Sequence, residues 1–128
     1  METKGFHIII DAFLCDEKLL NSADRLEASL IKIAEELNME VLHTYFHAFQ
    51  PHGVTGVLVL STSHMSVHTW PEKRYASLDI YTCGDSNPLD RVDAVISSFS
   101  SEYAVVYDIL RGEKRQRTPG SIVITKEN

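Results

Sequence analysis

The sequence contains few of the residues on which small stapled domains depend. It has only two cysteines, Cys15 and Cys83, and they form no C-x-x-C pair. Two such cysteines do not indicate the disulfide framework of a small secreted scaffold. The chain therefore has to rely on a hydrophobic core, and its 128 residues, 44% of them hydrophobic, are enough for a single domain spanning 1–128.

Long apolar runs and an excess of basic residues are also missing. The N-terminal stretch METKGFHIIIDAFLCDEK does not join a basic start to a long apolar segment, so it predicts neither a signal peptide nor a transmembrane span. We therefore expect a cytoplasmic protein without a membrane partner. Twelve Lys and Arg against eighteen Asp and Glu give a net charge of −6, and no basic patch indicates a nucleic-acid partner. The acidic balance is compatible with a small cationic ligand.

Hydrophobic periodicity predicts a chain rich in strands. Strands are expected at 5–14, 39–49, 54–60, 63–70, 75–83, 103–110 and, at an edge, 121–125. One helix is expected from an N-cap at Ser22, and a second opens at Asn87 and Pro88. Short loops between strands favour an α+β fold, a two-layer sandwich in which a mainly antiparallel sheet carries two helices on one face. The other face needs a cover, so we expect a homodimer.

The stretch LSTSHMSVHTWPEK, residues 60–73, is unusual for a strand. His64, Ser66, His68 and Trp70 alternate with other residues and share one face, directly after the hydroxyl run 61–63. A half-exposed polar strand would explain this pattern. The same pattern suits one wall of an active site in which a hydroxyl group reacts.

Two other kinds of site compete with that interpretation. His43 and His47 share a strand face, but residues four apart on a strand stand about 13 Å apart. They cannot chelate one ion, so we expect no metal. Cys83 and His68 are the residue types of a Cys–His hydrolase, but this pairing arises easily in a chain with six histidines.

A third chemistry starts from Ser63. In a tight turn, its hydroxyl can attack the carbonyl carbon of Thr62 and replace the peptide bond by an ester. Removal of the Ser63 α-proton by a base then eliminates the ester, and hydrolysis leaves a pyruvoyl group. Such a ketone forms a Schiff base with an amino acid and accepts electrons when carbon dioxide departs. These steps need a base, a hydroxyl and a later acid, and His68, Thr55 and Cys83 are residues of those types.

The segment GVTGVLVLSTSHMSVHTWPEKRYASLDIYTCGD strongly resembles the prokaryotic S-adenosylmethionine decarboxylases, a small pyruvoyl-dependent family that cleaves itself. The family pattern is G-V-[ST]-G, then E-S-H-[LMI]-[ST]-[IV]-H-[TS]-[WF]-P-E, then [FY]-T-C-G-[DE]. These motifs correspond here to Gly53–Gly56, Ser63–Glu72 and Tyr81–Asp85. Looser similarity extends to HIIIDAFLCD and FHAFQPHG, so the resemblance covers most of residues 1–90.

The resemblance implies how this chain would mature. Cleavage between Thr62 and Ser63 would give chains 1–62 and 63–128, and Ser63 would become the pyruvoyl cofactor. His68 would serve self-cleavage with help from the hydroxyl of Thr55. Cys83 would donate a proton to the decarboxylated product.

The resemblance also implies a substrate and an assembly. Phe49 would stack on the substrate adenine, and Trp70 and Glu72 would line the same site. The substrate would be S-adenosylmethionine, a cationic amino acid whose decarboxylated form is the aminopropyl donor for spermidine. The implied fold is an antiparallel sheet with helices on one face, paired as a dimer of cleaved chains with active sites at the interface.

Two residues depart from the family pattern. Thr62 stands where the family usually has Glu, and Gln50 stands where it tends to be apolar. The attacked atom is a backbone carbonyl, so the Thr62 side chain is not required by the chemistry, but the lost carboxylate bears on the choice of a cationic substrate. Some relatives decarboxylate arginine or ornithine, and these substrates stay open. So does an uncleaved, non-catalytic homologue that pairs with an active partner.

Overall fold

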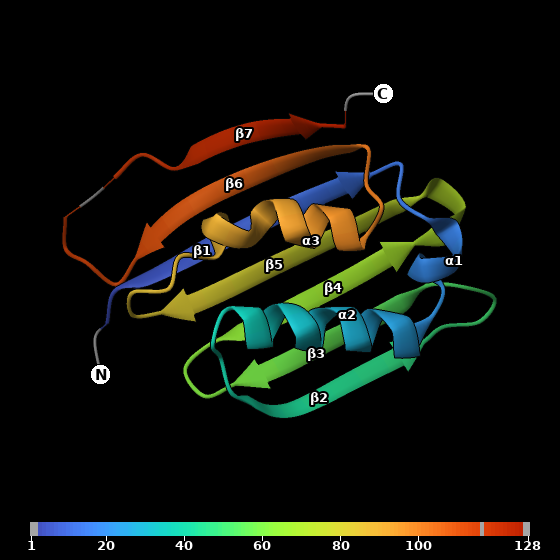
Figure 1. Ribbon diagram of the computed structural model, residues 1–128, viewed down its shortest axis with the longest axis horizontal. Coiled ribbons are helices and arrows are strands. Elements are labelled where there is room, and N and C mark those ends of the chain that lie inside the picture. The colour runs from blue at the N-terminus through green and yellow to red at the C-terminus, as the bar shows by residue number, and fades with distance from the viewer. Residues whose placement is uncertain (1–2, 116, 127–128) are drawn as a thin grey trace.

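A seven-stranded sheet with helices on one face forms the body of the computed structural model, which describes residues 3–115 and 117–126 (Figure 1). The strands are β1 (Gly5–Phe13), β2 (Val41–Ala48), β3 (Val54–Leu60), β4 (His64–Trp70), β5 (Tyr75–Cys83), β6 (Tyr103–Arg111) and β7 (Gly120–Thr125). The α-helices are α1 (Glu17–Leu20), α2 (Ala23–Glu36) and α3 (Val92–Ser98), with 3₁₀ helices η1 (Pro71–Lys73) and η2 (Pro88–Arg91). The expected α+β architecture is therefore confirmed.

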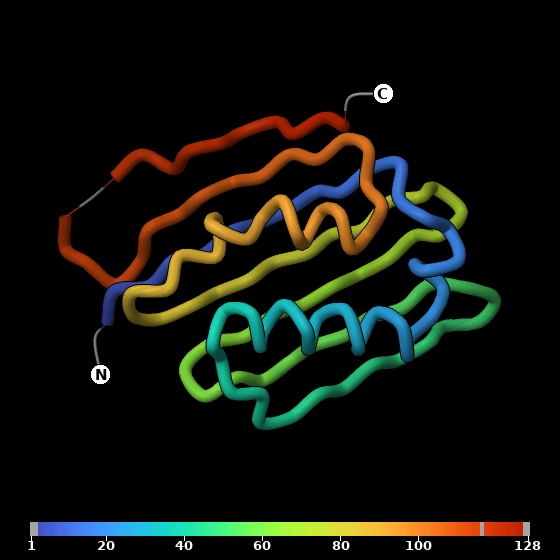
Figure 2. Tube along the Cα trace, in the orientation of Figure 1, coloured from blue at the N-terminus to red at the C-terminus, as the bar shows by residue number. Residues whose placement is uncertain are grey.

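The strand order is β2-β3-β4-β5-β1-β6-β7, and every neighbouring pair is antiparallel. Four of the six pairs join strands that follow one another along the chain, whereas β1, the first strand, pairs with β5 and β6 and runs between them (Figure 2). This insertion ties the two halves of the chain into one sheet. No helix in the described part of the chain has the length and apolar character needed to cross a membrane.

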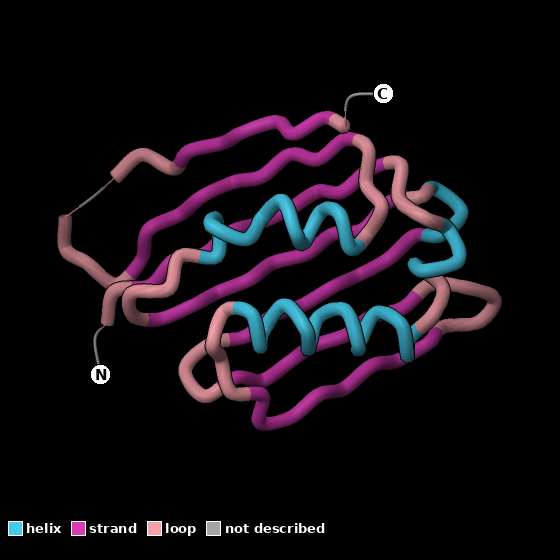
Figure 3. Tube along the Cα trace, in the orientation of Figure 1, coloured by secondary structure: helices cyan, strands magenta, loops and turns pink. Residues whose placement is uncertain are grey.

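The core lies between the sheet and the helices. Along β4, Met65, Val67 and Thr69 are buried toward the helices, because successive side chains of a strand point to opposite faces. Helix α2 supplies Leu26 and Leu30 at helical spacing, and the Ser22 hydroxyl accepts a hydrogen bond from Arg25 N as the expected N-cap. Figure 3 shows the helices on the near side of the strands, so the far face of the sheet, which we call the open face, is not covered by helices.

The second helix differs from the expected one. The Asn87 side chain caps it as predicted, but Asn87 Oδ1 accepts from Leu89 N at 3.0 Å, two residues ahead. The residues that follow form the 3₁₀ helix η2 (Pro88–Arg91), and α3 begins only at Val92. Strand β2 also departs from regular alternation, because its register with β3 shifts between Val41 and His43.

Candidate active site

A three-residue turn joins β3 to β4 and contains the predicted cleavage site. Leu60 N donates to Ser63 O at 3.0 Å, which closes the turn, and Thr62 at its tip is exposed. The Ser63 hydroxyl accepts a hydrogen bond from Cys83 N at 3.2 Å and lies 3.3 Å from the Thr62 hydroxyl. The structure therefore brings Ser63 and Cys83 together, at the point where β5 ends beside the start of β4.

The Cys83 thiol has a partner that we did not assign from the sequence. Cys83 Sγ donates to the Tyr81 hydroxyl at 3.5 Å, and both side chains belong to β5 and face the open side of the sheet. The signal was present, because Tyr81 lies in the family motif and is separated from Cys83 by one residue, which places both on one strand face.

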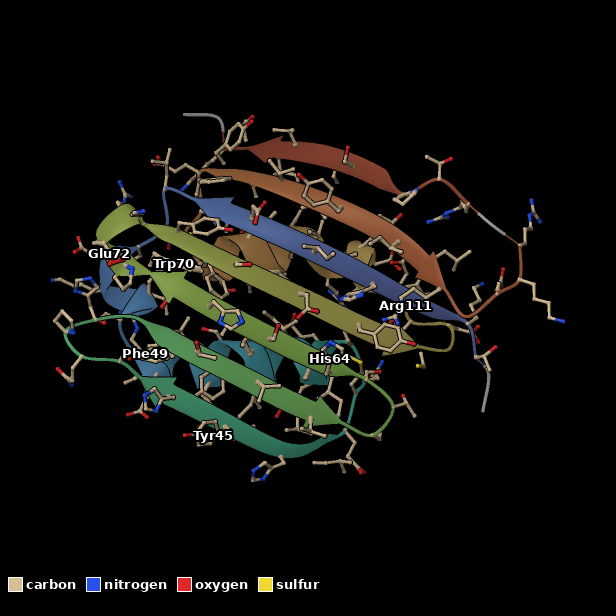
Figure 4. All side chains as sticks on the ribbon, turned by 180° about the vertical axis from the view of Figure 1, so that it is seen from behind. Tyr45, Phe49, His64, Trp70, Glu72 and Arg111 are labelled. Carbon is tan, nitrogen blue, oxygen red and sulfur yellow. The ribbon has the colours of Figure 1, made fainter. Side chains whose placement is uncertain are left out.

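Five of the predicted residues lie at the opposite end of the open face. They line one pocket of about 320 Å³, formed by Phe49, His52, Gly53, Val54, Thr55, His68, Thr69, Trp70 and Glu72. Figure 4 shows Phe49, Trp70 and Glu72 gathered at this end, whereas His64 and Arg111 lie toward the other. Phe49 and Trp70 are 47% and 41% exposed, so both aromatic residues are accessible to a ligand.

Polar contacts link four of the pocket residues in two pairs. Thr55 on β3 and His68 on β4 are register partners, and Thr55 Oγ1 lies 3.0 Å from His68 Nδ1. Glu72, on the 3₁₀ helix that Pro71 opens, forms an ion pair with His52. His52 was not among the predicted site residues, although its position in the loop directly before the G-V-T-G motif is a signal for it.

Within one chain, the two ends of the site remain separate. Five residues along an extended strand span about 16 Å, and this is the interval from Ser63 to His68. Ser63 and Cys83 form one half-site, which we call the serine end. Thr55, His68 and the other residues around the 320 Å³ pocket form the second, which we call the pocket end.

A polar cluster on the open face adjoins the serine end. Asp79 Oδ2 lies 2.7 Å from His7 Nε2 and 3.3 Å from His64 Nε2, and Ser66 Oγ donates to Asp79 Oδ1. Burial by itself would raise the pKa of Asp79, but the hydrogen bonds from Ser66 and His7 and the nearby His64 hold this pKa below its ordinary value.

The atoms of His7, His64 and Asp79 converge closely enough to suggest a metal site, with all three ligand atoms within 4.8 Å of one another. Two observations favour a hydrogen-bonded network instead. Both Asp79 oxygens already have protein donors, and Arg111 Nη1 lies 3.5 Å from His7 Nδ1, where its charge opposes a cation. This cluster includes neither His43 nor His47.

Comparison with known proteins places this geometry in a family. Residues 6–112 match the family model described as S-adenosylmethionine decarboxylase. The chain is 45% identical to the S-adenosylmethionine decarboxylase proenzyme of Thermococcus kodakarensis, over 99% of this chain and 90% of that protein. It is 43% identical to the proenzyme of the same name from Pyrococcus abyssi, over 99% of this chain and 93% of that one.

A solved structure agrees with the sequence relatives. The crystal structure of the adenosylmethionine decarboxylase from Aquifex aeolicus superposes with a TM-score of 0.75 at 28% identity, covering 92% of this chain and 100% of that one. Fold, motif and near-complete coverage thus point the same way, and the resemblance read from residues 53–85 is confirmed: the chain belongs to the S-adenosylmethionine decarboxylase family.

Proposed function

We propose that this chain is a proenzyme that cuts itself between Thr62 and Ser63, converts Ser63 into a pyruvoyl group and decarboxylates S-adenosylmethionine. The observation that carries the proposal is the place of the Ser63 hydroxyl, in a tight turn between paired strands and 3.2 Å from Cys83 N. The names and near-complete coverage of the relatives support it. A pyruvoyl group supplies a carbonyl that condenses with the substrate amine and withdraws electrons as carbon dioxide leaves.

Self-cleavage requires the Ser63 hydroxyl to reach the carbonyl carbon of Thr62, and both groups belong to the turn between β3 and β4. The Cys83 amide hydrogen bonds to Ser63 Oγ and restrains it there. Imidazole suits the base that then removes the Ser63 α-proton, because imidazoles titrate near neutral pH. We assign this role to His68, oriented by its contact with Thr55 Oγ1.

A second copy of the chain can supply the base. The open face is uncovered and carries exposed apolar side chains, among them Tyr45, Val59 and Trp70. Packed sheets stand about 10 Å apart. A two-fold axis between two such faces, running across the strands near Ser66, reverses the direction of β4 in the second copy. It thereby sets the Ser63 of each chain opposite the pocket end of its partner, so the homodimer completes two sites.

Substrate recognition follows from the pocket end. Phe49 and Trp70 are exposed aromatic residues, the kind of side chain on which a flat base such as adenine can stack. Glu72 presents a carboxylate that accepts hydrogen bonds from hydroxyls or attracts a cation. We assign to Cys83, at the serine end, the return of a proton to the product carbon, and the contact of its backbone amide with Ser63 Oγ supports this assignment.

The intact mass of the purified protein tests the proposal. We expect wild-type protein to separate into fragments 1–62 and 63–128, the second resistant to N-terminal sequencing because a pyruvoyl group has no amine. Ser63→Ala should stay one chain, and Ser61→Ala in the same turn should cleave normally. Wild-type protein that remains intact after prolonged incubation at several pH values would instead support a non-catalytic homologue.

Release of carbon dioxide from the cleaved protein tests the substrate. S-adenosylmethionine, arginine and ornithine should be compared at equal concentrations on one preparation. We expect turnover of S-adenosylmethionine alone. A preference for arginine or ornithine would overturn the substrate assignment and leave the self-cleavage standing.

A further inference from the structure

Tyr81 occupies the centre of the serine end without a role in the chemistry described so far. Its hydroxyl lies 3.5 Å from Cys83 Sγ, and its ring centroid lies 5.5 Å from that of His7 and 5.6 Å from that of His64. The Arg111 guanidinium stands 4.6 Å from the ring centroid on the same face. The ring is thus held on several sides, and its hydroxyl is directed at the thiol.

A glycine makes room for this arrangement. Gly5 on β1 is the register partner of Cys83, and it is buried. A Cβ atom at position 5 would lie 2.7 Å from Tyr81 Cε1 and 2.9 Å from Tyr81 Oη. The Gly5 backbone needs no left-handed conformation, so what requires glycine here is space, chiefly for the ring and hydroxyl of Tyr81 and also for Thr82 O at 3.0 Å.

The Tyr81 hydroxyl can act as a hydrogen-bond donor to Cys83 because it keeps its proton at neutral pH. The hydrogen bond with Cys83, followed by burial, raises the pKa of Tyr81 above its ordinary value, although Arg111 acts in the opposite direction. A phenol with a raised pKa keeps its proton at neutral pH. Tyr81 can accept the S–H hydrogen bond of the thiol and can donate its own O–H to a thiolate.

We propose that Tyr81 is the positioning residue for Cys83, held in place by the space at Gly5 and by the Arg111 guanidinium. This inference rests on the proposed function. While Cys83 is a thiol, its S–H points at Tyr81 Oη. When Cys83 gives this proton to the α-carbon of the decarboxylated product, the resulting thiolate accepts the Tyr81 O–H until a proton from water restores the thiol.

Delivery of the proton to the wrong carbon atom has a distinct chemical result. If the proton reaches the cofactor carbon instead of the product α-carbon, hydrolysis leaves an amino group on residue 63 and releases the product as an aldehyde. The enzyme is then inactive, and fragment 63–128 acquires a free N-terminal alanine. The number of turnovers before inactivation therefore reports on the delivery of the proton, separately from substrate binding.

Tyr81→Phe, Gly5→Ala and Tyr107→Phe test the proposal together. Tyr81→Phe removes the hydroxyl and keeps the ring, whereas Gly5→Ala displaces the ring. Tyr107→Phe is the control, because it removes the hydroxyl of another tyrosine on the open face, on strand β6. For Tyr81→Phe and Gly5→Ala we expect normal self-cleavage, a KM within twofold of wild type and about tenfold fewer turnovers before N-terminal alanine appears. Wild-type turnover numbers in Tyr81→Phe would overturn the proposal.

A measurement on uncleaved protein separates this inference from the proposed function. In Ser63→Ala, iodoacetamide should modify Cys83 and spare Cys15, which is fully buried. Adding Tyr81→Phe should slow Cys83 modification at pH 7.5 about threefold, because a thiolate loses a hydrogen-bond donor, while Tyr107→Phe should not. If the wild type does not decarboxylate but this difference appears, only the proposed function fails. Equal rates would show that Tyr81 does not act on Cys83.

Discussion

The two ends of the open face are built in different ways. At the serine end, Ser63 and Cys83 are linked through a backbone amide, and their neighbours hold one another by hydrogen bonds and ring contacts. At the pocket end, Phe49 and Trp70 leave much of their rings exposed, and Glu72 has only a half-exposed partner. The difference matches the proposed division of roles, in which the serine end carries out covalent chemistry, which tolerates little movement, and the pocket end binds a ligand that buries its surface.

The largest effect is expected for variants that test whether the serine end of one chain and the pocket end of another form a single site. Ser63→Ala and His68→Ala should each abolish self-cleavage when expressed alone, because each homodimer then lacks a nucleophile or a base. If the proposed homodimer forms, coexpression of the two variants yields mixed dimers in which the His68→Ala chain meets an intact His68 from its partner. We expect cleavage of up to about half of the His68→Ala chains, measured by intact mass.

Two results would contradict this shared site. Normal cleavage of His68→Ala alone would remove His68 from maturation. Failure of the coexpressed pair, in a preparation where mixed dimers are demonstrated by differently tagged chains, would mean that the serine end and the pocket end do not meet across a dimer.

A smaller effect is expected from the thiol at the serine end. Cys83→Ala should still self-cleave but lose about 100-fold in turnover, the usual scale for a missing general acid. Cys15→Ala is the matched control, since burial raises the pKa of that thiol to about 11 and places it in the core. This control should lose some thermal stability and keep its turnover per folded molecule. Near-normal turnover by Cys83→Ala would assign the proton to another group.

The pocket end should respond in KM rather than in turnover number. His52→Gln removes the imidazole partner of Glu72, and because both side chains are 40% exposed, solvent and salt weaken the contact between them. We expect KM for S-adenosylmethionine to rise about threefold at low salt and less at high salt, with kcat unchanged. A fall in kcat at constant KM would place His52 in the chemistry.

The smallest expected effect concerns stability at the cluster between the ends. Because the folded-state pKa of Asp79 is lowered, its stabilising contribution is present above its unfolded-state pKa and is lost as pH falls through the folded value. Asp79→Asn should cost about 1 kcal/mol in urea unfolding at pH 7 and progressively less below about pH 4. Exposed Asp90→Asn is the control, and an equal loss for Asp79→Asn at pH 3 and pH 7 would contradict this assignment.

Local pattern predicted much of this molecule. Alternation placed the strands and the open-face residues of β4, the Ser22 cap placed α2, and the motif singled out Ser63 and Cys83. The second helix was less well predicted, because a capping pattern does not distinguish a 3₁₀ turn from the first turn of an α-helix.

Contacts between distant segments were beyond such reasoning. Nothing in the periodicity of β1 indicates that it pairs with β5 and β6, so the space that Gly5 leaves for Tyr81 became visible only in the structure. The distance between Ser63 and His68 could have been calculated from the sequence, because the rise per strand residue used for His43 and His47 applies to these two residues as well. A motif that lists both residues does not by itself suggest the proposed arrangement, in which Ser63 and His68 of different copies of the chain form one site.

The course of β1 determines what a nicked molecule would be. A break after Thr62 leaves β1, β2 and β3 on one piece and the other four strands on the second. The pieces remain interlocked, because β1 still lies between β5 and β6 and β3 still pairs with β4. Folding of the cut protein becomes a meeting of separate polypeptides, so its melting temperature should rise with concentration. Once denatured, the two fragments would have to associate again before they could refold, so cleavage would make refolding depend on the concentration of both fragments.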